Sequence, residues 1–293
     1  MRKAAIGVIG VGMMGAGMAR CLLAAGHPVT LRAHRNRSRI EPLLDRGARE
    51  VDETAALVDA CDVLLTCLPN AEVVETLADE IAPLMRAGQM WIDTTTSRPG
   101  TSESIAARLA ERGAIFADAP VTGGPPQAET GQLISLVGCE EEHLATVEAV
   151  VGTYSKSVRR FGEAGRGHAA KLLNNLVSQG TMILLADAFR TAEATGVDRR
   201  ALFDVMMGGA ARSGTLEKAV APALEGDLSG AQFTVANAEK DLRYARDLIA
   251  EIEVSRAEVA AVLASRLGAL VSNGRGGDFV STMLGPELRS RAG

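Results

Sequence analysis

The chain has 293 residues, of which 47% are hydrophobic and 23% charged, which is enough for a sizeable core and for two domains. A net charge of −5 and an aromatic content of 3% argue against nucleic-acid binding and against electrostatic attraction to a membrane. The most hydrophobic N-terminal run, 4–19, has 16 residues with five glycines and is too short to span a bilayer. We therefore expect a chain without a membrane segment or a targeting signal.

The four cysteines, Cys21, Cys61, Cys67 and Cys139, form no CxxC pair. Their spacing suits neither a disulfide framework nor a zinc site. Apolar neighbours surround each of them, so we expect buried free thiols in a cytoplasmic protein. A cluster of His, Asp or Glu residues with metal-ligand spacing does not stand out either, and we expect no metal.

The first element is a buried strand over 4–10, followed directly by a GxGxxG motif and an apolar helical pattern that ends at Gly26. Strand, glycine motif and helix in this order are typical of a dinucleotide-binding loop, in which helix N-terminal amides bind the pyrophosphate. The alternative is a glycine-rich turn without a ligand. The predicted cofactor-binding residues are Gly10, Val11, Gly12, Met13, Met14 and Gly15.

The second predicted strand, 28–33, lacks the acidic residue that binds the ribose 2′-hydroxyl of NAD, because the first acidic residue of the chain is Glu41. Cationic and amide side chains stand there instead and could bind a 2′-phosphate. We therefore favour NADP and keep NAD as possible. The alternative is that the arginines are only solvated. The candidates for the 2′-phosphate are Arg32, His34, Arg35 and Asn36.

Further apolar runs alternate with helical stretches, which predicts a Rossmann-type, doubly wound α/β sheet. The predicted strands are 63–67, 89–93, 114–118, 132–138 and 157–161. Ligands of such sheets bind at the carboxyl ends of the strands. Leu68, Pro69 and Thr96 follow two of these strands, so we expect them to contact the cofactor.

The segment 118–128 is too rich in glycine and proline for a helix or strand, so we expect an irregular loop. The hydroxyl of Thr122 and the unobstructed backbone N–H groups of Gly123 and Gly124 can bind a carboxylate without a formal charge. The alternative is an ordinary surface loop.

From Gly165 onward helical periodicity replaces the strand pattern, which predicts an all-α C-terminal domain. We place the boundary between a 1–164 dinucleotide-binding domain and a 165–293 substrate and dimerisation domain. Asp198 and Ser255 are predicted N-caps. The predicted helices are 166–195, 198–208, 213–224, 234–253, 256–272 and 278–290.

The first of these helices carries Lys171, Asn174 and Asn175 at positions i, i+3 and i+4, so all three share one face. A cation beside two amides can form the polar floor of a binding site. The alternative is a solvated stripe on an amphipathic helix. Later in the chain, Lys240 and Asp241 form a surface ion pair, or Lys240 reaches either the cofactor or a carboxylate in the cleft.

Taken together, four motifs resemble those of the β-hydroxyacid dehydrogenase family, in the family's order and over essentially the whole chain. The first is the GxGxMG motif at 10–15, and the second is the DAPVSGG loop at 118–124, with Thr122 in place of serine. The third is GxGxxxKxxNN at 165–175, and the fourth is the KDL segment at 240–242.

The resemblance implies that Lys171 is the catalytic residue and that Asn174 and Asn175, with the Thr122–Gly124 loop, bind the substrate. It also implies cofactor contacts by Leu68, Pro69, Thr96 and Lys240, and a homodimer or homotetramer. The segment 32–37 departs from the family's Asn-Arg-Thr pattern, which leaves the residue that contacts the 2′-phosphate open.

The expected function is that of an NAD(P)-dependent oxidoreductase that interconverts a small, carboxylate-bearing β-hydroxy acid and its semialdehyde. Lys171 would act as general acid and base. One alternative is an imine reductase-like NADPH enzyme, although such enzymes typically carry Asp or Tyr in place of this lysine. The other is a non-catalytic nucleotide-binding homologue, which would have no need for Lys171, Asn175 and the Thr122 loop together.

Overall fold

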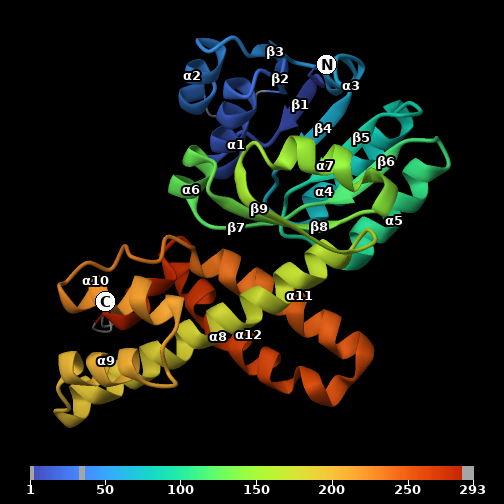
Figure 1. Cartoon of the computed structure of the whole chain (residues 1–293). Helices are drawn as coiled ribbons and strands as arrows, with labels where there is room; N and C mark the ends of the chain where they lie inside the picture. Colours follow the sequence, from blue (N-terminus) through green and yellow to red (C-terminus); the bar gives the residue numbers. More distant parts are fainter. Residues whose placement is uncertain (1–2, 33–36, 286–293) are drawn as a thin grey trace. The chain divides into compact units, whose positions relative to one another are not determined.

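The computed structural model of the chain describes residues 3–32 and 37–285. The chain divides into two compact units, Met1–Lys171 and Leu172–Gly293 (Figure 1). The first unit contains two hydrophobic clusters and the second unit contains one. The units divide within a long helix, whereas the predicted boundary at 164/165 precedes that helix, so the boundary stays a prediction.

A nine-stranded sheet forms the centre of the first unit, counted over the described residues. Its strands are β1 (Ile6–Ile9), β2 (Val29–Arg32), β3 (Arg49–Val51), β4 (Val63–Thr66), β5 (Met90–Asp93), β6 (Ile115–Asp118), β7 (Val121–Thr122), β8 (Leu133–Gly138) and β9 (Ser155–Gly162). The order is β3-β2-β1-β4-β5-β6-β8-β7, and β9 pairs with β8. Strands β1 to β6 are parallel, which confirms the predicted Rossmann-type sheet, whereas β8 is antiparallel to β6 and β7.

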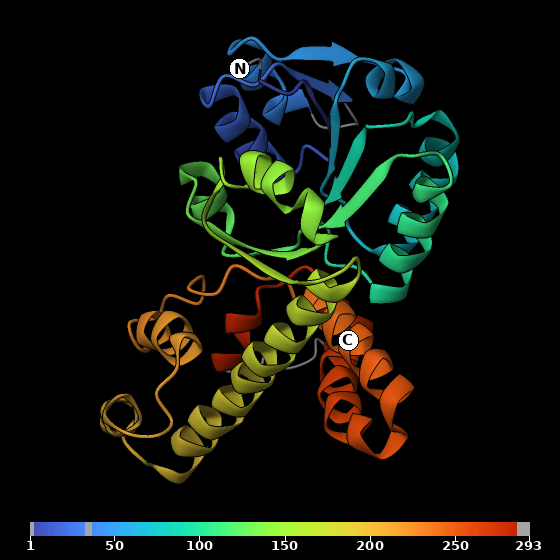
Figure 2. The ribbon, with the colours of Figure 1, turned by 45° about the vertical axis from the view of Figure 1, so that its right-hand side comes forward.

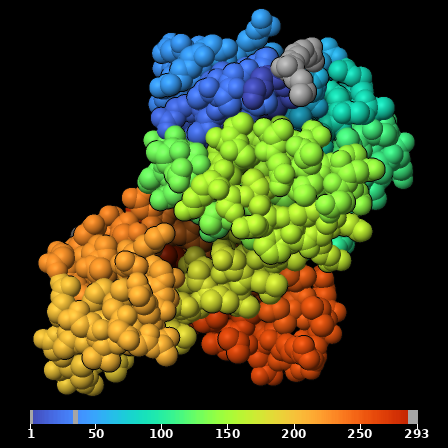
Figure 3. Space-filling view, in the orientation of Figure 1, coloured from blue at the N-terminus to red at the C-terminus, as the bar shows by residue number. Residues whose placement is uncertain are grey.

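Helices cover both faces of this sheet (Figures 1 and 2). One face packs against α1 (Met13–Ala24), α2 (Glu41–Leu44), α6 (Pro125–Thr130) and α7 (Leu144–Val151). The other packs against α3 (Thr54–Asp59), α4 (Ala71–Ile81) and α5 (Pro99–Ala110). Short 3-10 turns are η1 (Arg37–Arg39), η2 (Ala82–Leu84) and η3 (Glu141–His143). In Figure 3 the yellow-green segment with α7 and β9 covers the front of this unit.

Strand β4 shows why the central strands are apolar without alternation. Val63 and Leu65 belong to one hydrophobic cluster and Leu64 to the other, so both faces of the strand are buried. Parallel strands that are covered on both faces have this continuous apolar pattern.

Two parts of the first unit differ from the prediction. The segment 118–128, predicted to be irregular, contains β7 and the beginning of α6. Pro125 and Pro126 take the first positions of α6, where a helix needs no N–H donor, and Gly131 ends it with a φ of 69°. Strand β3 was not predicted, and it pairs in parallel with β2.

The second unit is built from helices, which confirms the predicted all-α character. Helix α8 (Arg166–Thr195) has 30 residues, begins in the first unit and is unbroken in Figure 2. Next come α9 (Arg199–Gly208), the π-helical turn η4 (Leu216–Val220), α10 (Ala221–Leu224), α11 (Val235–Ile252), η5 (Val254–Ala257), α12 (Glu258–Leu270), the π-helical turn η6 (Val271–Arg275) and the 3-10 helix η7 (Val280–Leu284).

The two predicted N-caps have opposite outcomes. Asp198 caps α9, because its Oδ1 accepts the N–H of Ala201 at 2.7 Å. The prediction for Ser255 was wrong: it lies inside η5, and its hydroxyl donates to Glu253 Oε1 at 2.6 Å. Within the predicted helix 278–290, the described residues 278–285 contain only the 3-10 helix η7. Residues 286–290 lie outside the described part of the chain.

All four cysteines are free thiols. Cys61 and Cys139 are buried as predicted, whereas Cys21 and Cys67 are partly exposed. Burial raises the pKa of Cys61 and of Cys139 to about 11, so both thiols are protonated at neutral pH. Every helix of residues 3–32 and 37–285 is too short or too polar to cross a bilayer.

Candidate active site

The glycine-rich loop connects β1 to α1 in the first unit. Gly10 has a φ of 96°, and a Cβ there would lie 2.1 Å from the carbonyl oxygen of Cys67, just after β4. A Cβ on Gly15 would lie 2.1 Å from the carbonyl oxygen of Gly10, so a larger residue would push α1 away from the strand. A Cβ on Gly12 would meet nothing within 4 Å. The loop is therefore tight on the side of β4 and open at the start of α1.

The start of α1 fits a dinucleotide pyrophosphate. Gly12 precedes the helix without a side-chain cap, and the first turn contains no acidic residue. First-turn N–H groups have no partner inside a helix and, with the helix dipole, they bind anions. Met13 is exposed, and Val11 and Met14 are half-buried. The loop thus offers backbone amides and apolar side chains to a ligand.

The cationic segment after β2 is described only in part. Arg32 ends β2 and lies in register with Ile9 at the end of β1. Its guanidinium lies 3.6 Å from Glu80 Oε2, and both side chains are partly exposed. Because exposed ion pairs are weak, Glu80 does not hold the Arg32 guanidinium firmly. The other candidates, His34, Arg35 and Asn36, lie outside the described residues.

The other predicted cofactor contacts of the first unit follow adjacent parallel strands. Leu68 and Pro69 follow β4, and Thr96 follows β5. The N–H of Leu68 donates to Thr95 Oγ1 at 2.9 Å, which ties the two turns together. Pro69 is exposed, whereas Leu68 and Thr96 are half-buried. Two loops at the carboxyl ends of β4 and β5 are thus fixed relative to each other.

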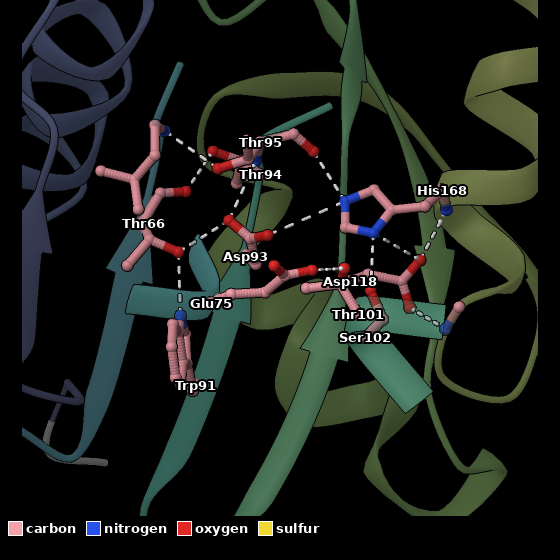
Figure 4. A network of polar contacts seen from close by, with 12 residues as sticks. Thr66, Glu75, Trp91, Asp93, Thr94, Thr95, Thr101, Ser102, Asp118 and His168 are labelled. Atoms are coloured by element: carbon pink, nitrogen blue, oxygen red, sulfur yellow. Dashed lines mark hydrogen bonds and ion pairs between the residues drawn. The ribbon is translucent and has the colours of Figure 1, made fainter. Parts of the chain in front are cut away.

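A buried polar network stiffens these strand ends (Figure 4). Trp91 Nε1 donates to Thr66 Oγ1 at 2.8 Å, and that hydroxyl donates to Asp93 Oδ1 at 2.7 Å. The N–H of Thr95 donates to the same carboxylate oxygen at 3.1 Å, and Thr94 Oγ1 donates to the carbonyl of Thr66 at 2.6 Å. Neutral donors around one buried carboxylate thus lock the ends of β4 and β5.

In the predicted carboxylate-binding loop, one of the three candidate donor groups already donates a hydrogen bond within the protein. Thr122 ends β7, in register with Ile134 of β8, and Gly123 is exposed with a φ of 120°. The N–H of Gly124 donates to Gln127 Oε1 at 2.9 Å, as part of the cap of α6. Gly124 therefore does not offer the unobstructed amide that we expected. The substrate-binding role of the loop stays a prediction.

A buried carboxylate fixes the start of α8. Asp118 ends β6 and is fully buried. Its Oδ1 accepts the N–H of Gly165 at 2.7 Å, and its Oδ2 accepts the N–H of His168 at 2.6 Å. Burial raises the pKa of Asp118, and the nearby His168 ring and these N–H donors oppose that shift. Strand β6 therefore caps the helix that carries Lys171.

Two of the three predicted polar residues of α8 are buried, and Asn174 is exposed. Lys171 is 7% exposed and Asn175 is 4% exposed, whereas Val177 is 70% exposed. A solvated polar stripe would expose Lys171 and Asn175, so that alternative is excluded for these two residues. Lys171 and Asn175 are thus buried one helical turn apart on α8.

In the second unit, Asp241 is the common partner of the predicted site residues Asn175 and Lys240. Asn175 Nδ2 donates to Asp241 Oδ2 at 2.6 Å, and Asn174, itself exposed, donates to Asn175 Oδ1 at 3.1 Å. Lys240 Nζ lies 2.8 Å from Asp241 Oδ1 and 5.1 Å from the centroid of the Tyr244 ring. Asp241 is 1% exposed, so this pair is not the weak surface pair of the alternative interpretation.

Four buried polar residues of the first unit were not predicted from the sequence. Thr95, Ser102, Asp118 and His168 are all buried and hydrogen-bonded to one another or to neighbouring turns. A signal was present for two of them, because Asp118 begins the DAPVTGG loop and His168 lies inside the GRGHAAK motif. Within 3–32 and 37–285, no group of three or more His, Cys, Asp or Glu residues could hold a metal ion.

Two protein-family models match the chain, one in each half. Residues 5–162 match the family described as the NAD binding domain of 6-phosphogluconate dehydrogenase. Residues 165–285 match the family described as NAD-binding of NADP-dependent 3-hydroxyisobutyrate dehydrogenase. The chain is 34% identical to L-threonate dehydrogenase from Cupriavidus necator, over 76% of each chain.

Several further relatives carry the name 3-hydroxyisobutyrate dehydrogenase. The chain is 33% identical to the mitochondrial enzyme of Drosophila melanogaster, over 69% of this chain and 62% of that one. A solved structure of the Mycobacterium tuberculosis enzyme with L-serine is similar with a TM-score of 0.86 and 27% identity, over 96% of this chain and 98% of that one.

The first family match covers more than half of the chain, and its boundaries enclose the glycine loop, the strand-end turns and the Thr122 loop. The second encloses Lys171, Asn175 and Lys240. The chain therefore belongs to the β-hydroxyacid dehydrogenase family and is an NAD(P)-dependent hydroxyacid oxidoreductase.

Proposed function

We propose that the protein interconverts a small β-hydroxy acid and its semialdehyde, that NADP(H) is its preferred cofactor, and that Lys171 is the general acid and base. The observation that carries the proposal is the burial of Lys171 on a helix whose first turn is capped by Asp118. A cation in a fixed, water-poor position suits proton transfer to an oxygen that becomes negatively charged.

Each hydride transfer is accompanied by a proton transfer to or from Lys171. A nicotinamide bound there would supply the hydride chemistry, giving a hydride to the carbonyl carbon in reduction and taking one from the alcohol carbon in oxidation. In reduction, Lys171 Nζ as ammonium donates a proton to the former carbonyl oxygen, which becomes the hydroxyl. In oxidation, Lys171 as neutral amine accepts the proton of that hydroxyl.

The substrate carboxylate is assigned to the Thr122 loop. The Thr122 hydroxyl and the Gly123 amide hold it through neutral donors, with Gly124 closing the turn. The Asn175 amide, oriented by Asp241 and Asn174, holds a second substrate oxygen, which is a positioning effect. The L-serine in the Mycobacterium tuberculosis structure likewise carries a carboxylate and a β-hydroxyl.

The cofactor is assigned to the carboxyl edge of the sheet in the first unit. The glycine loop takes the pyrophosphate, Leu68, Pro69 and Thr96 take the nicotinamide half, and Lys240 reaches the cofactor by family resemblance. Arg32 at the end of β2, with no acidic residue before Glu41, supports NADP over NAD. The description of the second matching family as NADP-dependent supports the same preference.

A homodimer or homotetramer is part of the proposal. Helix α8 exposes Leu173, Val177 and Leu184 on one face, and α12 exposes Val259 and Val262. Apolar surface of this kind is typically covered by another chain. Four free thiols suit a reducing compartment, so we place the protein in the cytoplasm.

The test is turnover by Lys171→Ala. We expect kcat to fall about 10²- to 10⁴-fold, the range for loss of general acid catalysis, while the Kd for NADPH changes less than about threefold. Lys156→Ala, which removes an exposed lysine of β9, is the matched control and should keep wild-type kcat. Near wild-type turnover by Lys171→Ala would refute the assignment.

A further inference from the structure

His168 is a buried polar residue that the proposed chemistry does not use. It is the third residue of α8 and is 0% exposed. Lys171 follows three positions later, so the two side chains leave neighbouring positions of the same helix face. Whatever fixes His168 therefore also fixes the turn of helix from which Lys171 extends.

Both nitrogens of the His168 ring have hydrogen-bond partners (Figure 4). Nε2 lies 2.6 Å from the carbonyl oxygen of Thr95, and Nδ1 lies 2.6 Å from Ser102 Oγ. A carbonyl oxygen can only accept, so Nε2 carries the proton and donates it. Ser102 belongs to α5, so the ring connects α8 both to that helix and to the turn after β5.

The turn that receives the Nε2 bond belongs to the proposed cofactor site. Thr95 directly precedes Thr96, and its Oγ1 accepts the N–H of Leu68 at 2.9 Å. Its own N–H donates to Asp93 Oδ1 at 3.1 Å. One residue, Thr95, therefore connects His168 to both strand-end turns that carry the nicotinamide contacts.

The surroundings of the ring are rigid as well as polar. Asp118 Oδ2 lies 3.7 Å from Nδ1 and accepts the backbone N–H of His168, and Asp93 Oδ2 lies 3.9 Å from Nε2. All three side chains are fully buried. Buried networks of this kind permit few alternative arrangements, so the register between α8 and the Thr95 turn is fixed.

We propose that His168 is a positioning residue for the reaction: its Nε2–H bond to the Thr95 carbonyl sets the distance between Lys171 and the Thr94–Thr96 turn. The proposal rests on the proposed role of Lys171 as the acid and base. Its physical basis is that proton and hydride transfer need the reacting groups placed within a few tenths of an ångström, and a shift of about 1 Å costs about 100-fold in rate.

Three substitutions at His168 separate positioning from folding. His168→Gln places an amide N–H where Nε2 lies and keeps the Thr95 bond, whereas His168→Asn reaches only the position of Nδ1 and keeps the Ser102 contact. His168→Leu removes both bonds. Val147→Ala in α7, a buried residue remote in sequence from the network, is the control for loss of stability alone.

The measurement is steady-state kinetics with NADPH and a turned-over semialdehyde, together with the thermal midpoint of each variant. We expect kcat of His168→Gln within about threefold of wild type, and kcat of His168→Asn and His168→Leu lower by about 10- to 100-fold. The KM for the semialdehyde should change less than about threefold, because its carboxylate contacts lie elsewhere. Val147→Ala should lower the thermal midpoint and keep kcat.

Equal kcat for the Gln and Asn variants would overturn the proposal, and so would a loss of kcat in Val147→Ala at the same loss of stability. If His168→Leu does not fold, the Gln and Asn pair carries the same test. The proposed function fails separately: retained turnover by Lys171→Ala refutes the acid and base, whereas an inactive Lys171→Ala beside a fully active His168→Asn refutes only the positioning role.

Discussion

Two buried carboxylates, Asp118 in the first unit and Asp241 in the second, are stabilised by different kinds of partner. Asp118 accepts two backbone N–H groups at the start of α8, whereas Asp241 contacts two side chains, Asn175 and Lys240. The first arrangement fixes the path of the main chain, and the second fixes the direction of functional side chains. The two units therefore contribute differently: the first places a helix, and the second orients an amide and a cation.

The largest loss of stability should follow removal of Asp241, the buried carboxylate whose partners are side chains. Asp241→Ala removes the buried carboxylate that Lys240 and the Asn175 amide both contact, so we expect a loss of about 3–5 kcal/mol in the free energy of unfolding. Asp247→Ala, which removes an exposed carboxylate from the same helix, should cost less than about 1 kcal/mol. Urea denaturation measures both, and equal losses would show that the burial of Asp241 has no energetic consequence.

Asp118→Asn tests the buried carboxylate whose partners are backbone N–H groups. The amide can accept only one of the two N–H groups and turns an NH₂ toward the other, so we expect a loss of about 1–3 kcal/mol at pH 7. Ser102→Ala is the matched control, because it removes a hydrogen bond of the same network without touching the cap of α8, and it should cost about 1 kcal/mol.

The pH dependence of this variant sharpens the comparison. Because burial raises the pKa of Asp118, the folded state binds its proton more tightly than the unfolded state does. The contribution of Asp118 to stability therefore falls as pH rises through the interval above 3.8, and it stays low at higher pH. The gap between wild type and Asp118→Asn should be larger at about pH 4.5 than at about pH 7. A larger gap at neutral pH would mean that the two N–H donors outweigh burial.

The smallest effects concern one helix cap in each unit. Asn70 Oδ1 accepts the N–H of Val73 at 2.9 Å at the start of α4, and Asp198 Oδ1 accepts that of Ala201 at 2.7 Å at the start of α9. Replacing either by alanine should cost about 1 kcal/mol. Trp91, the single tryptophan of the chain, reports by fluorescence on the first unit, and circular dichroism reports on both. A loss below about 0.3 kcal/mol in either variant would contradict the capping role of the replaced side chain.

Local patterns predicted most of the fold. The apolar runs became strands, parallel from β1 to β6, and the glycine motif became the tight turn between β1 and α1, because each depends on residues that are close in sequence. Strand β3 escaped prediction because its three residues, Arg49–Val51, form no apolar run. Helix α6 escaped because its two prolines suggest a loop, although proline is well suited to the first turn of a helix.

The site could be predicted less completely than the fold. Helical spacing placed Lys171 and Asn175 one turn apart, but it left open whether they are buried or solvated. Their surroundings depend on residues far along the chain: Asp241 follows Asn175 by 66 positions, and Thr95 precedes His168 by 73 positions. The engaged amide of Gly124 depends on Gln127, whose side-chain direction no sequence pattern shows.

The proposed hydroxyacid chemistry can be measured as the initial rate of NADPH and NADH oxidation by the wild-type protein with a panel of carbonyl compounds. The panel contains succinic, methylmalonic and tartronic semialdehydes, glyoxylate and a cyclic imine. We predict turnover of at least one semialdehyde, with NADPH preferred over NADH. Preference for NADH would show that Arg32 and its neighbours are only solvated. Turnover of the imine alone would contradict the hydroxyacid chemistry in favour of an imine reductase, and no turnover of any compound would contradict it in favour of a non-catalytic homologue.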